Sequence, residues 1–271
     1  GARIEDYSIT GKYSQEGSLS ELETDHIFTI YPSAFITYKP QNNGAKNSYN
    51  LSYSRRVDRP GINQINPIRV WSSFRITDVG NPDLIPQFTN SLEFNFSRNV
   101  KKGSLTSGIF YRRIKDEITR FAFLDTENPG RILFSYDNYT SNSAYGFELS
   151  GSYKPLKWWS FNASFDLYSR VIRGIDVGEL IEVNNNLYNF KMNHSFKLKD
   201  KLTFQVIGLY RGANTNLQYL TKSIYFVNLG ARYGFAKGKG SINVSFNDVL
   251  RSRRFAFDAT RPILQVGEFF R

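Results

Sequence analysis

Few residues in this sequence are of types that could carry out catalysis. Cysteine is absent and histidine occurs only at positions 26 and 194, so a thiol nucleophile, a thiolate metal site and an imidazole-rich metal site are excluded. His194 falls on the apolar side of an alternating segment and His26 precedes a strand, so neither is placed as a general base. Asp116 and Glu117 are adjacent, and adjacent residues of a strand point to opposite faces. We therefore expect no enzyme active site, no metal and no cofactor.

Other residues could bind a ligand without transforming it. The segment from Val57 to Gln87 contains prolines 60, 67, 82 and 86, and the pattern predicts it as the longest irregular loop. Long loops inside compact domains are usually functional. The residues in or next to this segment that we expect to be exposed and able to stack on a ligand or form charge-assisted contacts are Arg56, Arg59, Trp71 and Phe74. Aromatic side chains suit sugars and arginine suits anionic chelates, and the sequence leaves both open. A second long loop is predicted from Leu124 to Ser143.

The elements that position these residues are strands with alternating character. The clearest hairpin runs from Ser223 to Asn247, and one face of its first arm carries Tyr225, Val227, Leu229, Ala231, Tyr233 and Phe235. A period of two puts apolar and polar residues on opposite sides of a sheet. Aromatic residues lie near the ends of the apolar face. This pattern is typical of a strand with lipid on one side and a wet lumen on the other.

The same pattern recurs along the chain and predicts about eleven strands. Short turns are predicted at Pro40 to Asn47, Val100 to Gly103, Lys154 to Lys157, Lys199 to Lys201 and Ala236 to Gly240, and long loops at the other strand ends. At the start, Gly1 to Lys12 is predicted as a strand and Tyr13 to Asp25 as a polar loop. Alternating short and long connections indicate an all-β, antiparallel, up-and-down transmembrane β-barrel, with residues 1–271 forming a single partial barrel domain. Mean hydropathy is −0.43 and we find no apolar run of roughly 18 residues, which excludes a helical membrane protein.

Residues on the polar side of these strands are expected to line the lumen: Glu93, Asn95, Glu148, Asn162, Asp166, Lys191, Asn193 and Arg232. They could line a substrate path, contact a plug, or form a plain solvated wall.

The net charge of +11 and the isoelectric point of about 9.7 raise nucleic acid as a partner. The basic residues are spread through turns and loop ends and do not form one run, which favours solvated turn charge. We expect no nucleic acid partner.

Four short motifs point to a family: YSRRVDRP (53–60), INP (65–67), GNPDLIP (80–86) and SFNDVLRSRRF (245–255). Together they resemble the outer-membrane β-barrel region of TonB-dependent receptors of the Bacteroidetes type. GNPDLIP also has a structural interpretation, because its prolines and Gly80 could fix a rigid return into the next strand.

The resemblance implies a bacterial outer-membrane protein that contacts lipid, captures an unknown small nutrient with long extracellular loops and is gated by a plug. It also implies energy from TonB through an N-terminal part and allows a surface lipoprotein partner. We expect the chain to be the C-terminal half of a barrel of roughly 22 strands, without the plug and without one further strand after Arg271.

Three alternatives stay open. The first is a non-transporting outer-membrane barrel that acts as a scaffold or interaction subunit of a larger complex. The second is a soluble β-rich binding or adhesin domain, and the third is an outer-membrane hydrolase.

Overall fold

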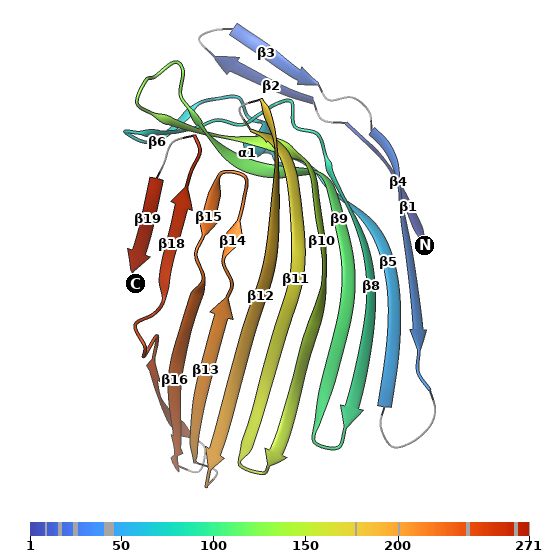
Figure 1. The fold of residues 1–271 in the computed structure, drawn as a ribbon, viewed down its shortest axis with the longest axis vertical. Helices are drawn as coiled ribbons and strands as arrows, with labels where there is room; N and C mark the ends of the chain where they lie inside the picture. The colour runs from blue at the N-terminus through green and yellow to red at the C-terminus, as the bar shows by residue number, and fades with distance from the viewer. Residues whose placement is uncertain are drawn as a thin grey trace.

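The computed structural model describes residues 1–8, 10–15, 18–23, 27–40, 46–176, 178–199, 201–236, 239–262 and 265–270. Its main sheet is one curved array in which each strand along the path pairs with the next in antiparallel fashion (Figure 1). The eleven strands on this path are β1 (Ala2–Tyr7), β4 (Ile27–Tyr38), β5 (Lys46–Asp58), β8 (Gln87–Val100), β9 (Gly103–Leu124), β10 (Ile132–Leu156), β11 (Trp159–Asp176), β12 (Glu179–Leu198), β13 (Leu202–Arg211), β16 (Ile224–Phe235) and β17 (Gly240–Phe246). The up-and-down β topology predicted from the sequence is confirmed.

Short turns gather at one end of this sheet, at the bottom of Figure 1. Val100 pairs with Gly103 across the β8–β9 turn, and Leu156 pairs with Trp159 across the β10–β11 turn. The centres of three other predicted turns, at 41–45, 200 and 237–238, lie outside the described residues. In bacterial barrels the short turns lie on the periplasmic side, so we take the opposite end as the outer rim.

One face of the sheet carries apolar side chains that form a continuous row across neighbouring strands. Reading across neighbouring strands, the register aligns Ile36, Leu51, Phe94, Ile109, Phe147, Leu167 and Tyr188. These side chains keep 37–64% of their surface exposed, because no second layer of the described chain covers them. Soluble proteins rarely expose apolar patches of this extent, so this face is the one expected to meet hydrocarbon.

Aromatic residues border the apolar face at both ends. At the upper border, the hydroxyl of Tyr210 donates to that of Tyr188 at 3.3 Å, and their rings stack at 5.3 Å. At the lower border, Trp159 Nε1 donates to Nδ1 of His194, which stacks on Phe196. His194 thus belongs to an aromatic cluster on the apolar face, as its parity predicts. His26 lies outside the described residues.

The two longest strands continue far beyond this apolar band. On β9 the band runs from Gly103 to Tyr111, nine residues, which matches the roughly 9–11 residues that a tilted strand uses to cross a bilayer. The loop predicted from Leu124 to Ser143 is wrong, because β10 begins at Ile132 and the connection is only 125–131. Beyond the bilayer there is no lipid face, so these strands lack the alternation that identifies the others.

Above the apolar band, β9 and β10 bend across the polar face of the sheet (Figure 1). We call residues 115–140 the arch. Phe121 and Tyr139 of the arch form a buried core with Ile172 of β11 and with Leu217. The side-chain amide of Gln218 makes two hydrogen bonds with the backbone of Ala122, at 2.8 and 2.9 Å. The arch therefore reaches over β11 and β12 to the loop that follows β13.

The segment from Val57 to Gln87 is largely irregular, as predicted, but it also contains three short regular elements that the sequence did not predict. β5 continues to Asp58, and α1 (Ile62–Ile65), β6 (Val70–Ser73) and β7 (Ile76–Asp78) follow. β7 pairs in parallel with the β10 part of the arch, where β10 no longer pairs with β11. The β6–β7 hairpin therefore widens the arch.

The family motifs explain why this segment is ordered. The Gly80 amide donates to the Asn66 carbonyl at 2.7 Å, and a Cβ at position 80 would lie 2.5 Å from the Asn66 nitrogen. Leu84 and Pro86 are buried, and the amide of Ile85 donates to Asn138 of the arch. GNPDLIP packs on INP and guides the chain into β8, which supports the structural interpretation of that motif.

Two terminal regions also depart from the sequence pattern. Where one strand and a polar loop were predicted, the chain forms β1 and a separate hairpin of β2 (Thr10–Gln15) and β3 (Ser18–Glu23). Near the other end, a smaller sheet contains β14 (Asn214–Thr215), β15 (Tyr219–Thr221), β18 (Arg254–Ala259) and β19 (Gln265–Phe270). In SFNDVLRSRRF, Asp248 has a φ of +50° and accepts the amides of Ser252 and Arg253, which bends the chain between β17 and β18. The further strand expected after Arg271 stays a prediction.

Candidate functional site

Two of the four predicted ligand contacts lie together on the outer rim. Trp71 lies within β6 and Phe74 lies in the turn of the β6–β7 hairpin, with 67% and 84% of their surfaces exposed. The guanidinium of Arg131, from the arch turn, lies 4.1 Å from the Trp71 ring centre and 5.8 Å from that of Phe74. Arg131 joins this patch only through the tertiary fold, and nothing in its sequence surroundings identifies it.

The two predicted arginines occupy different places. Arg59 forms an ion pair with Glu5, and its guanidinium carbon lies 4.4 Å from the ring centre of Tyr7. The charge of Arg59 is therefore already paired with residues of β1. The hydrogen bond from Arg59 lowers the pKa of Glu5. Arg56 is exposed on the polar face of β5, opposite Thr89. β1 and β6 lie on opposite sides of the rim in Figure 1, so Arg59 is not part of the Trp71 patch.

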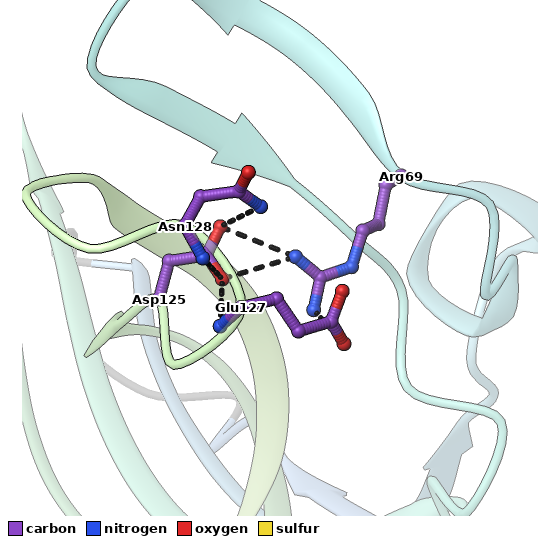
Figure 2. Close-up of polar contacts among 4 residues, drawn as sticks. All are labelled: Arg69, Asp125, Glu127 and Asn128. Carbon is purple, nitrogen blue, oxygen red and sulfur yellow. Dashed lines mark hydrogen bonds and ion pairs between the residues drawn. The ribbon is translucent and has the colours of Figure 1, made fainter.

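A buried carboxylate connects the β6–β7 hairpin to the arch (Figure 2). Arg69 donates from Nη1 to both oxygens of Asp125 at 3.1 Å, and its Nη2 lies 2.8 Å from Glu127. The backbone amides of Glu127 and Asn128, and the Asn128 side chain, also donate to Asp125. Burial alone would raise the pKa of Asp125, but these hydrogen bonds outweigh it and the pKa is lowered. This node fixes the outer surface beside Trp71, and the sequence gives no signal for its pairing.

The eight residues predicted to line the lumen share one face of the sheet. Asn95 lies opposite Gly108, Gly108 opposite Glu148, and Glu148 opposite Asp166. In the neighbouring rows, Asn162 pairs with Asn193, Ser164 with Lys191, and Arg232 with Asn243. Glu93, two residues from Asn95, has the same orientation. Their role in lining a lumen stays a prediction.

This polar face carries charge of both signs. Arg112 lies 3.6 Å from Glu93, which also accepts a hydrogen bond from Ser91 at 2.8 Å. Nearer the arch, Asn142 bridges Glu117 and Arg170 through hydrogen bonds of 2.7 and 3.1 Å. A hollow of about 400 Å³ lies between these groups. The face is thus a wall of hydrogen-bonding groups suited to contact with water or a polar solute.

Within the described ranges, no cluster of three or more His, Asp or Glu side chains has a geometry that could hold a metal ion.

None of the helices that the structure describes is long and apolar enough to span a membrane.

Comparison with known proteins agrees with this geometry. The model of the outer membrane protein beta-barrel family matches residues 1–269. A search of curated proteins found no match. The resemblance to barrels of TonB-dependent receptors is confirmed in fold, whereas its Bacteroidetes type stays a prediction.

Solved structures similar to this chain include the siderophore receptor PirA from Pseudomonas aeruginosa, with a TM-score of 0.64, 12% identity and coverage of 93% of this chain and 46% of that one. The copper transporter OprC has a TM-score of 0.60 and 12% identity, with coverage of 90% and 39%. The FrpB iron transporter from Neisseria meningitidis has a TM-score of 0.59 and 13% identity, with coverage of 92% and 38%.

The chain spans less than half the length of these three structures, and at such low identity the likeness describes the fold alone. The exposed apolar row, the polar face behind it and the family match over nearly the whole chain lead to one assignment. The chain belongs to the outer membrane protein beta-barrel family and is part of a multi-strand barrel of the bacterial outer membrane.

Proposed function

We propose that the protein is a receptor and transporter that takes up a small nutrient through the outer membrane. The observation that carries this proposal is the continuity of the polar face. It runs from the short-turn end, through Asn162 and Glu148, to the network that Asn142 and Arg170 form with Glu117 of the arch. A polar path behind an apolar, lipid-facing wall is what a hydrated solute needs to cross a membrane.

Capture would begin at the outer rim. Trp71 and Phe74 are exposed and can stack on a ligand, and the half-buried Arg131 places a positive charge beside their rings. Arg56 offers a second cation on the polar face. The solute would then exchange its water for hydrogen bonds with the polar wall. The family match and receptor-like neighbours support a non-enzymatic role.

The proposal includes energy input from TonB and a plug that gates the barrel, both outside this chain. The siderophore, copper and iron proteins with the same fold support this class of transport. A surface lipoprotein partner is also part of the proposal.

The test is growth and uptake in a strain that lacks the gene. We expect loss of growth on one nutrient, restoration by the intact gene, and no restoration when TonB is deleted or the proton gradient is dissipated. Normal uptake of every nutrient tested, together with loss of an outer-membrane complex, would contradict transport and favour the scaffold alternative.

A further inference from the structure

A cavity of about 620 Å³ lies below the arch, outside the residues predicted from the sequence. Its walls come from three places: the tip of the arch, the β14–β15 segment, and the β18–β19 hairpin. This volume is within the range of pockets that hold small organic ligands.

The charged groups on the cavity wall are all cations: Arg120, Arg211, Lys222 and Arg261. Three of them have acidic partners outside the lining. Arg120 pairs with Asp78, Lys222 lies 3.2 Å from Asp258, and Arg261 lies 3.5 Å from Glu179. Arg211 differs, because no carboxylate in the described part of the chain lies within 4 Å of its guanidinium. It is therefore the cation available to a ligand.

A second hollow of about 460 Å³ shares Arg211 and Ile224 with the first and continues along the polar face. Its charged lining residues are Lys191, Arg211, Arg253 and Asp166. Cations therefore outnumber carboxylates along the whole path, and a positive potential here attracts anions.

The uncharged lining of the main cavity combines polar side chains, such as Asn214 and Gln265, with apolar and aromatic ones. Phe255 and Phe257 lie 6.2 Å apart between ring centres, and Phe134 lies beneath the guanidinium of Arg120 at 4.2 Å. Rings of this kind contact flat apolar groups through their faces and edges. A small hydrated ion would leave this surface unused.

From this lining we infer that the cavity binds an amphipathic organic anion, with its acidic group at Arg211 and its apolar part against Phe255 and Phe257. The inference rests on the proposed receptor function and specifies its ligand class. No metal is needed, because the charge of the acidic group itself is recognised.

The test uses the full-length protein in lipid nanodiscs, with empty nanodiscs as the blank, and isothermal titration calorimetry. The probes are 1-naphthoate and its neutral analogue 1-naphthylmethanol. We expect naphthoate to bind at least about tenfold more tightly than the alcohol, because a charged hydrogen bond forms only with the acid. EDTA should leave the affinity unchanged.

Two variants locate the binding. Arg211→Gln should remove most of the preference for the acid, whereas Arg113→Gln, which removes an exposed arginine from the opposite face of β9, should keep it. Phe255→Leu should weaken naphthoate binding several-fold and leave the Arg211-dependent preference in place. Equal affinity for both probes, or equal effects of the two arginine variants, would overturn the inference.

These results separate the inference from the proposed function. If the gene is required for uptake of a nutrient but the purified protein does not prefer naphthoate, the inference is wrong and the proposed transport function is unaffected. If the purified protein shows the Arg211-dependent preference but deletion of its gene affects no uptake, the anion site is supported and the proposed transport function is wrong.

Discussion

Asp125 illustrates how one carboxylate can order an outer loop. It is 3% exposed and accepts hydrogen bonds from Arg69, Glu127 and Asn128 (Figure 2). Its pKa is lowered in the folded protein, so it stabilises the loop above the pKa of the unfolded carboxyl, about 3.9, and this stability is lost as pH falls through the lower folded value.

We therefore expect the amides of residues 125–131 to lose hydrogen-exchange protection, corrected for intrinsic rates, as pH is lowered below about 4. Asp125→Asn should reduce protection by about tenfold at neutral pH and remove the pH dependence, because a charged acceptor becomes a neutral one. Glu127→Gln is the matched control, since Glu127 is mostly exposed and its pairing contributes little. An unchanged profile for Asp125→Asn would show that other contacts hold the loop.

Most residue-level partners could not be predicted from the sequence. Arg69 and Asp125 are 56 positions apart, and only the fold brings them together. Arg131 and Arg211 lie in unremarkable turns and strand ends. The shared face of the eight polar residues, of which Glu93 is the first and Arg232 the last, could be predicted from the sequence. It follows from the alternation of side chains within single strands, which is a local property.

The loop between β5 and β8 makes a sharp prediction about glycine. At Gly80 an added Cβ would clash with the Asn66 backbone, whereas at Gly61, in the same loop, the nearest atom is Gln64 Oε1 at 3.6 Å. Gly80→Ala should lower the free energy of unfolding by roughly 1–3 kcal/mol and Gly61→Ala by much less. Urea unfolding followed by tryptophan fluorescence in lipid vesicles measures both. Equal stabilities would contradict the packing of GNPDLIP on INP.

The two faces of β13 make a second prediction for an element. Val206 lies on the apolar face, opposite His194 and Leu229, and Gln205 is its neighbour on the polar face. Val206→Arg should cost about 2–4 kcal/mol, because it puts a charge into hydrocarbon, whereas Gln205→Arg should cost little. The readout is urea unfolding in vesicles. Comparable losses would mean that the faces are assigned the wrong way round.

Strands could be predicted where lipid imposes a period of two, as in Trp159 to Leu167. The approach failed for the β10 part of the arch, for β2 and β3, and for β6 and β7. These elements lie outside the apolar band, so their two faces meet similar surroundings and the sequence shows no regular alternation. Short turns could be predicted from their Gly, Lys and Asn residues. The bends at Asp116 and Asp248 could not, because they depend on non-glycine residues with φ of +56° and +50°.

At the scale of the whole molecule, the exposed apolar face predicts how the protein behaves on extraction. The full-length protein should stay with the outer-membrane fraction through washes with high salt and with sodium carbonate, and leave it only in detergent. A periplasmic protein bound to the membrane by charge alone is the control that salt releases. Recovery of the protein in the carbonate supernatant would favour the adhesin-like alternative.

The arch has a consequence for the speed of recognition. Gln218 and the core of Phe121, Tyr139, Ile172 and Leu217 hold it in place through contacts within the chain. A solute that reaches the rim therefore meets a surface that is already ordered. The conformational entropy of these strands is lost on folding and not on binding. The association rate constant should then be set by diffusion and electrostatic steering, and not by the rate at which a loop closes.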